Sequence, residues 1–312
     1  MEIKASAPAK LIMFGEHASR HGKPSIVFAL DQRIIVSFKP RNDDKIFLSA
    51  PDIGVAQVEY PSKELDFVTS SIELFFKETK AKKCGFDLST KSEIQAGFGS
   101  SGATVVATIG ALDDFFKTKL SKFDILKLGQ KVITAVQGHG SGIDIASATY
   151  GWTIVFEMGK EPVVITKEQL PIVVGNTGIK VKSKPIVLAV EVLEKKFPVV
   201  LNRIIDNMGD IGARAKKALK ENDLETIGQL MNINQGMLYG EGVSSLILEK
   251  LIFAAKEAGA YGAKLSGAGV GDNMIALVSE KNKQSVADAI NKAGGKAIIA
   301  KIGEGLRIER TN

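Results

Sequence analysis

The most informative segment of this sequence reads Gly97-Phe98-Gly99-Ser100-Ser101-Gly102-Ala103. Residues without a Cβ atom allow positive φ angles and let a ligand approach the main chain. If a helix begins at Ser100 or Ser101, its first amide N–H groups lack intrahelical partners, and the helix dipole adds positive potential there. The segment therefore predicts a phosphate cradle, although a flexible turn with a serine N-cap would use the same residues.

Two familiar phosphate-binding motifs differ from this segment. A P-loop needs a lysine after its second glycine, and a dinucleotide fingerprint needs GxGxxG at a first strand–helix turn followed by an acidic residue. Neither pattern stands here. The next residues, 103–112, are nearly uncharged, so we expect a buried helix that holds the loop rigidly.

The composition is that of a globular protein with a sizeable core. Of the 312 residues, 45% are hydrophobic and 24% are charged, and the longest apolar runs are too short for a membrane span. Because no basic-then-apolar leader opens the chain, we expect a cytoplasmic protein. The single cysteine, Cys84, excludes an intramolecular disulfide and a thiolate zinc cluster. The histidines His17, His21 and His139 are too few for an imidazole-rich metal site.

The net charge of +6 raises the question of a nucleic-acid partner. The 41 lysines and arginines are interspersed with 35 acids, without an arginine-rich arm or a basic–aromatic RNA-binding signature. An anionic small substrate explains the charge at least as well.

Hydrophobic periodicity predicts an α+β chain that is rich in strands first and in helices later. Strands are expected at residues 3–14, 33–38, 45–48, 57–60, 85–90, 92–94, 151–157, 163–166, 172–174, 274–278 and 296–302. Helices are expected at residues 65–79, 101–116, 123–137, 187–196, 197–222, 224–238, 244–258 and 283–293. The second half begins near Leu170, and the length allows two domains.

Two further clusters accompany the loop. Lys10 lies inside an otherwise apolar strand that leads to Glu16 and His17. A lysine there needs an anion unless it lies at an edge or faces solvent, and a single histidine such as His17 often has a structural role. Residues 262–272 form a second glycine-rich segment, either a plain tight turn or another phosphate loop.

Together the three segments resemble the motifs of the GHMP kinase superfamily. APAKLIMFGEH at 7–17 is similar to its first motif, GFGSSGA at 97–103 to its second and KLSGAGVGD at 264–272 to its third, and the resemblance spans about residues 5–310. Residues 15–24, 141–144 and 231–238 are most similar to the archaeal-type mevalonate kinases of that superfamily. The resemblance implies a two-domain GHMP fold. Residues 1–170 would be a ribosomal-protein-S5-domain-2-like α/β domain that binds ATP, and residues 171–312 a ferredoxin-like, helix-rich domain.

The resemblance also implies a reaction of isoprenoid biosynthesis, in which ATP phosphorylates the 5-hydroxyl of mevalonate. Residues 97–103 would bind ATP, and the Ser101 hydroxyl would reach Mg²⁺. Asp144 would take the proton from the hydroxyl, and Lys10 would steer that hydroxyl and stabilise the ionised aspartate. The residues expected to bind the acceptor are Lys10, Glu16, His17, Asp144, Gly267 and Ala268. Apart from the motifs, Asp144 would be interpreted as a helix cap.

The sequence departs from the family pattern in four places. Residues 131–137 contain no carboxylate where the family carries a metal-binding glutamate, so Ser101, the phosphates and water would hold more of the Mg²⁺. Gln95 and Ala96 stand where a proline and a longer spacer are common, and Val270 stands where glycine is usual. Arg20 replaces an apolar residue; it either binds a substrate anion or faces solvent.

Other functions stay open at this point. A phosphomevalonate kinase or another GHMP small-molecule kinase would need extra cations for its acceptor, and candidates are Arg20, Lys23, Lys180 and Lys182. A non-catalytic nucleotide-binding or RNA-binding module would be expected to have lost Lys10 or Asp144, and both are present. The partners we expect are ATP and the small-molecule acceptor, without nucleic acid or membrane, and a homodimer stays open.

Overall fold

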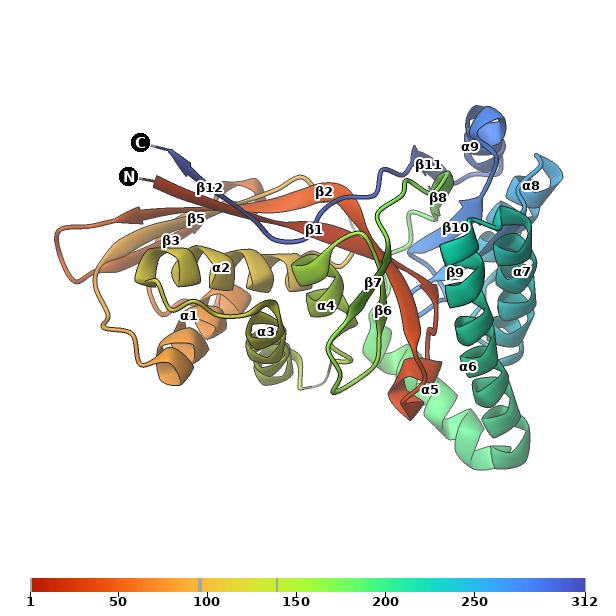
Figure 1. Cartoon of the computed structure of the whole chain (residues 1–312), viewed down its shortest axis with the longest axis horizontal. Coiled ribbons are helices and arrows are strands. Elements are labelled where there is room, and N and C mark those ends of the chain that lie inside the picture. The colour runs from red at the N-terminus through yellow and green to blue at the C-terminus, as the bar shows by residue number, and fades with distance from the viewer. Residues whose placement is uncertain (1, 95–96, 139, 312) are drawn as a thin grey trace. The chain divides into compact units, whose positions relative to one another are not determined.

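The computed structural model describes residues 2–94, 97–138 and 140–311, and its strands and helices fall into two units (Figure 1). The first unit contains Met1–Lys10, Ala29–Trp152 and Gly303–Asn312, and the second contains Leu11–Phe28 and Thr153–Ile302. Gln95, Ala96 and His139 lie outside the described residues. The predicted division into two contiguous domains after residue 170 stays a prediction.

The sheet of the first unit has the strand order β12-β1-β2-β5-β3-β4. These strands are β1 (Glu2–Phe14), β2 (Ser25–Pro40), β3 (Ile46–Ala50), β4 (Val55–Glu59), β5 (Phe86–Ser92) and β12 (Arg307–Thr311). β3 pairs in parallel with β5, whereas β12 pairs antiparallel with the beginning of β1. Along β1, Ile3, Ala5, Ala7 and Ala9 are buried while Lys10 is only half-buried. This period of two is the expected pattern of a strand with one face on the core.

Helices cover one face of this sheet (Figure 1). They are α1 (Asp66–Thr79), α2 (Ser100–Phe116), α3 (Lys122–Gln137) and α4 (Ile143–Tyr150). α2 contacts the other three helices, and its residues 105–112 are all buried, as its uncharged sequence predicts. The ring of Phe38 in β2 stacks on Phe86 of β5 and packs at a tilt against Phe115 of α2, each with 4.6 Å between ring centroids. Aromatic packing therefore joins helix to sheet.

The second unit contains two groups of strands. β6 (Thr153–Phe156) pairs with the first residues of β2 and with β7 (Val163–Thr166). A separate antiparallel sheet has the order β11-β8-β10-β9. Its strands are β8 (Ile172–Asn176), β9 (Gly262–Ser266), β10 (Asn273–Leu277) and β11 (Lys296–Ile299).

Helices and short 3₁₀ turns complete the second unit. The helices are α5 (Ser183–Lys196), α6 (Pro198–Glu221), α7 (Leu224–Gly240), α8 (Leu246–Glu257) and α9 (Lys283–Lys292). The 3₁₀ turns are η1 (Ala18–His21) and η3 (Glu280–Asn282), and η2 (Pro51–Ile53) lies in the first unit. Leu251 of α8, Met274 of β10 and Ile290 of α9 belong to one apolar core. α7 packs on β9, which brings the second glycine-rich segment under a helix.

Most predicted elements are confirmed, and two predictions are wrong. Residues 85–94 do not form a hairpin; β5 is a single strand whose pairing with β2 runs through Lys91 to Ser92. Residues 262–266 are not loop but strand β9, and a Cβ atom at Gly262 would lie 2.0 Å from the carbonyl oxygen of Gly228 in α7. Glycine there permits close packing of a helix on a strand. Within the described residues, no helix is long and apolar enough to cross a membrane.

Candidate active site

The glycine–serine loop ends where α2 begins. Gly97 and Gly99 have φ angles of 86° and 78°, which side chains rarely adopt, and Gly99 is the N-cap of the helix. No side chain of the described residues caps this end, so the first amide groups of α2 are available to a ligand. Phe98 is buried and anchors the loop, while Ser100 is exposed and Ser101 half-buried. The phosphate cradle stays a prediction, which this geometry permits.

Lys10 and Asp144 meet beside this loop, within the same unit. The Lys10 Nζ atom lies 3.2 Å from Asp144 Oδ1, and their side chains are 13% and 43% exposed. The Lys10 main-chain N–H donates to the Phe98 carbonyl over 3.0 Å, which fixes the strand to the loop. Largely buried and paired with a carboxylate, Lys10 has the anion that its place in an apolar strand required.

Two glycines of the loop allow this close approach. A Cβ atom at Gly99 would lie 3.2 Å from Lys10 Cε, and one at Gly102 would lie 2.7 Å from Asp144 Cβ. Any side chain at Gly102 would therefore force α2 away from Asp144. The loop, the lysine and the aspartate form one cluster in the first unit.

Asp144 is not a helix cap. α4 begins at Ile143 with Gly142 as N-cap, so Asp144 lies inside the first turn. Its carboxylate forms an ion pair with Lys10, and α4 has no side-chain cap hydrogen bond. The side chain lies in the first helical turn, where the helix dipole attracts negative charge.

The second unit contains another ion pair, between Glu16 and Lys264. Both side chains are 0% exposed. Lys264 lies in β9 and also donates to the Leu265 carbonyl over 2.6 Å. Burial lowers the pKa of Lys264, and Glu16 opposes that shift. Lys264 was not among the predicted site residues.

His17 follows Glu16 and contacts the third motif. Its Nε2 atom lies 3.0 Å from the Ala268 carbonyl oxygen, so Nε2 carries the hydrogen and donates. Burial lowers the pKa of His17, which favours the neutral imidazole. The buried Nδ1 atom has no hydrogen-bond partner among the described residues and can accept a hydrogen bond.

Ser266 connects the same two segments of the second unit. Its hydroxyl accepts from the Ile12 N–H over 2.9 Å and donates to the Ile12 carbonyl over 2.8 Å. The turn that follows is strained at Val270, which has a φ of 67° where the family usually has glycine. Gly267 and Gly269 have φ angles of 103° and 93°.

Two of the cations proposed for a phosphorylated acceptor follow Glu16 in the sequence, and both have carboxylate partners. Arg20 pairs with Glu191 of α5, and Lys23 pairs with Asp206 of α6 over 2.6 Å. His21 lies 3.1 Å from Glu194, so two side chains of η1 contact α5, while Lys23 just after η1 contacts α6. Arg20 is therefore neutralised by a carboxylate in this structure.

One buried acid in the second unit was not predicted from the sequence. Glu241, at the C-terminus of α7, is 3% exposed, and neither carboxyl oxygen has a hydrogen-bond partner among the described residues. Burial raises the pKa of Glu241 to about 8, and the nearby acids Glu194 and Glu16 add to the shift. A helix C-terminus also disfavours a negative charge. Its carboxyl group is therefore protonated at neutral pH.

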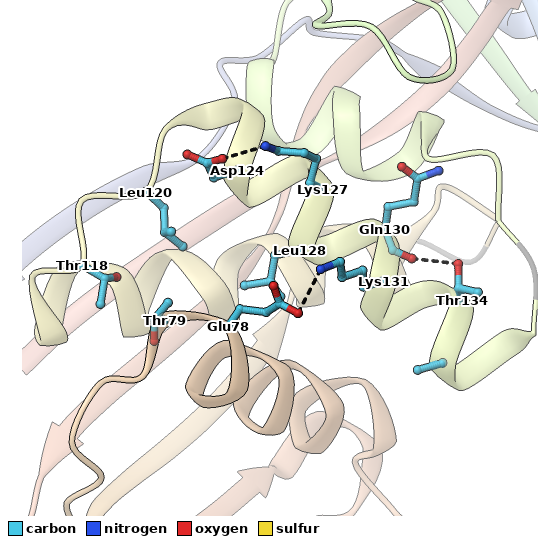
Figure 2. A pocket seen from close by; sticks show the side chains of 11 residues that line it. Glu78, Thr79, Thr118, Leu120, Asp124, Lys127, Leu128, Gln130, Lys131 and Thr134 are labelled. Carbon is cyan, nitrogen blue, oxygen red and sulfur yellow. Dashed lines mark hydrogen bonds and ion pairs between the residues drawn. The ribbon is translucent and has the colours of Figure 1, made fainter.

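The described residues contain no group of three histidine, cysteine or acidic side chains that could hold a metal ion. The first unit contains a cavity of about 950 Å³, lined by the end of α1, the turn after α2 and one face of α3. Figure 2 shows the side chains that line it. Ion pairs Glu78–Lys131 and Asp124–Lys127, each 2.9 Å long, occupy its wall. None of the predicted site residues lines it.

Two family models match this chain. The model described as GHMP kinases N terminal domain matches residues 66–152, and the model described as GHMP kinases C terminal matches residues 215–296. The mevalonate kinase of Pyrococcus furiosus is 40% identical, over 99% of this chain and 99% of that protein.

Solved structures are also similar to this chain. The mevalonate kinase of Methanococcus jannaschii superposes with a TM-score of 0.82 at 25% identity, covering 97% of this chain and 98% of the other. The mevalonate kinase of L. major, solved in complex with R-mevalonate, has a TM-score of 0.80 at 26% identity and coverage of 96% in both chains.

Proposed function

The chain belongs to the GHMP kinase family, and from this premise we propose that it transfers the γ-phosphoryl group of ATP to the 5-hydroxyl of mevalonate. It is an ATP-dependent kinase with a small-molecule acceptor. The single observation that carries the assignment of the site is the contact between the glycine–serine loop and the Lys10–Asp144 pair. Phosphate held at the start of α2 would lie next to a base and a cation.

We infer that the main chain of residues 97–102 binds the terminal phosphates of ATP. The amide groups at the start of α2 point toward an anion, and the helix dipole adds to their attraction. The residues assigned to ATP are Gly97, Phe98, Gly99, Ser100, Ser101, Gly102 and Ala103. Because main-chain atoms do this binding, side-chain changes at Asp144 should leave nucleotide affinity nearly unaltered.

Asp144 is the general base in this proposal. Its carboxylate is 43% exposed and can therefore reach an acceptor hydroxyl. As the oxygen of the alcohol forms its bond to the γ-phosphorus, the bond from that phosphorus to the β,γ-bridging oxygen breaks and ADP leaves. The hydroxyl proton passes to Asp144. The Lys10 ammonium offsets the negative charge that develops on the alcohol oxygen and on the β,γ-bridging oxygen.

The protein groups fit a Mg²⁺ ion that is carried largely by the nucleotide. The Ser101 hydroxyl is half-buried in the first turn of α2 and would be the protein ligand. Mg²⁺ keeps several waters and is commonly bound through phosphates plus one or two protein oxygens. When bound, it neutralises charge on the β- and γ-phosphates.

In the second unit, the residues that we assign to the acceptor are His17, Gly267 and Ala268. The neutral imidazole donates through Nε2 to Ala268 and keeps Nδ1 as an acceptor, which suits a hydroxyl group. Glu16 belongs to the same motif, but its side chain has no exposed surface.

Phosphomevalonate as the acceptor is less well supported. A second phosphate needs unpaired cations, and Arg20 and Lys23 already pair with Glu191 and Asp206. Lys180 and Lys182, both exposed before α5, remain candidates.

The test supplies ATP with either mevalonate or 5-phosphomevalonate and identifies the product by ³¹P NMR while ADP release is followed. Mevalonate should give 5-phosphomevalonate with a kcat/KM at least about a hundredfold above that for the second acceptor. Preference for 5-phosphomevalonate would reverse the assignment. Salt-sensitive RNA binding without ADP release would favour the binding-module alternative.

The remaining expectations concern the surroundings of the enzyme. We infer a cytoplasmic enzyme without nucleic-acid or membrane partners, and a homodimer stays a prediction. Sedimentation of the purified chain would establish its oligomeric state.

A further inference from the structure

The ion pair between Glu16 and Lys264 is unusual for a substrate-binding motif because neither side chain has exposed surface. Lys264 also donates to the Leu265 carbonyl, so the ammonium is held on two sides. A group that contacts a substrate must offer at least part of its surface. These two side chains offer none.

The pair belongs to a set of contacts that joins the first and third motifs within the second unit. Ser266 makes two hydrogen bonds to the main chain of Ile12, and His17 donates to the Ala268 carbonyl. Glu16 lies between Ile12 and His17 on the first segment, and Lys264 lies two residues before Ser266 on the second. Residues 12–17 and 264–268 are therefore held in one geometry.

We propose that Glu16 and Lys264 are positioning residues, which fix His17 and the Gly267–Ala268 turn for the acceptor and do not touch the acceptor. The proposal rests on the proposed function, since it assumes that His17 and this turn bind mevalonate. It differs from the expectation that Glu16 lines the pocket. It also gives a role to Lys264, which the motif alone left without one.

Electrostatics supplies a way to separate positioning from contact. Removing one member of a buried ion pair leaves an uncompensated charge and disturbs its surroundings, whereas replacing both with apolar residues of similar volume is often tolerated. Methionine approximates the length of both side chains. A positioning pair should therefore be replaceable as a pair, but a carboxylate that binds substrate should not.

The experiment compares Glu16→Met, Lys264→Met and the double variant with the wild-type enzyme, at a temperature where each is folded. Each single change should raise the KM for mevalonate roughly tenfold or more, because small displacements of binding groups are costly. The double variant should return to within about threefold of the wild type. The KM for ATP should stay within about twofold in all variants, because its proposed site lies in the first unit.

Two results would overturn the proposal. A folded double variant whose KM for mevalonate stays as high as that of the single variants would mean that the Glu16 carboxylate contacts the acceptor. Single variants with lower stability but an unchanged KM would mean a purely structural pair. If both single variants fail to fold, the double variant decides alone by the same KM criterion.

A second readout separates this proposal from the proposed function. ¹⁵N NMR of the imidazoles, of which the chain has three, reports the His17 Nε2–H hydrogen bond without turnover. The His17 signal should change in the single variants and return in the double variant. A wild-type enzyme that fails to phosphorylate mevalonate would refute the proposed function, while the NMR comparison would still test positioning.

The matched control is Lys283→Met, which breaks a 2.8 Å ion pair with Glu280 on the surface of the same unit. Exposed pairs contribute little, so its KM values and its His17 signal should equal those of the wild type within about twofold. A similar loss in the control would show that any lysine-to-methionine change in this unit has the effect.

Discussion

Two lysine–carboxylate pairs can be compared, one in each unit. Lys10 and Asp144 lie 3.2 Å apart with side chains 13% and 43% exposed, whereas Lys264 and Glu16 have no exposed side-chain surface. Both lysines lie in strands, and both pair with an acid far away in sequence. The chemistry is the same, but the surroundings are different.

The difference indicates what each pair can do. An exposed carboxylate can accept a proton from a substrate, and breaking a partly exposed pair removes little folding energy. A fully buried pair cannot meet a substrate, and breaking it leaves a charge in a medium of low polarity. We therefore expect the first pair to control turnover and the second to control stability and geometry.

The largest effect should follow the loss of the base. Asp144→Asn keeps the shape of the side chain but removes its basicity, so kcat should fall roughly 10²–10⁴-fold. Binding of a non-hydrolysable ATP analogue should change less than about threefold, because main-chain amides hold the phosphates. Steady-state kinetics and calorimetric titration measure the two quantities.

The control for this change is Glu73→Gln, at an exposed acid on α1. It should leave both quantities unchanged. Turnover of Asp144→Asn near the wild-type rate would show that another group takes the proton.

The next effect concerns folding. Lys264→Met should lower the free energy of unfolding by about 3–5 kcal/mol, because Glu16 is then buried without a cation. Lys10→Met should lower it by about 1 kcal/mol or less and should instead reduce kcat, because that pair is partly in water. Urea denaturation of the two variants makes the comparison. Equal losses of stability would remove the distinction between the pairs.

Glu241 should make stability depend on pH. Its pKa is raised to about 8 in the folded chain, so folded molecules keep a proton that unfolded ones lose above their ordinary pKa. The wild type should therefore lose stability relative to Glu241→Gln as pH rises from about 4.5 to about 8, by roughly 3 kcal/mol between pH 5 and 7.5. Below this window the two proteins should differ by a constant amount.

The groups around Glu241 are Glu16, which pairs with Lys264, and Glu194, which lies beside His21. Denaturant midpoints at pH 5, 6, 7 and 8 would reveal the slope. Glu257→Gln, at an exposed acid ending α8, serves as the control and should follow the wild-type profile. Parallel profiles for wild type and Glu241→Gln would contradict the assigned protonation.

The Lys10–Asp144 pair could be predicted from the sequence. A lysine inside an apolar strand indicates a nearby anion, and the resemblance to a known family names Asp144 as that anion. The 133 residues between them carry no periodicity that would predict the contact. It depends on the packing of α2 against α4, which Gly102 permits.

The Glu16–Lys264 pair has the same sequence pattern, a lysine between apolar residues, but it was not predicted. Lys264 lies between Ala263 and Leu265, both buried, which is the pattern seen around Lys10. The surrounding glycines and serine suggested a loop, because they are weak strand formers. Glu241 stands between two glycines and has the local pattern of an exposed turn. Its burial comes from tertiary packing at the end of α7, which no local pattern encodes.

The smallest effect should come from the glycine that lets the loop approach the first pair. In Gly102→Ala the new Cβ atom would lie 2.7 Å from Asp144 Cβ and 3.0 Å from the Asp144 carbonyl carbon, so α2 and α4 must separate slightly. Overpacking of this kind costs about 1–3 kcal/mol, and we expect about 1–2 kcal/mol here together with a roughly tenfold lower kcat. Gly236→Ala, where nothing lies within 4 Å of the added atom in α7, should instead stabilise the chain by up to about 1 kcal/mol at unchanged kcat. If both alanines behaved alike, the contact between the loop and Asp144 would not be tight enough to set the geometry of the first pair.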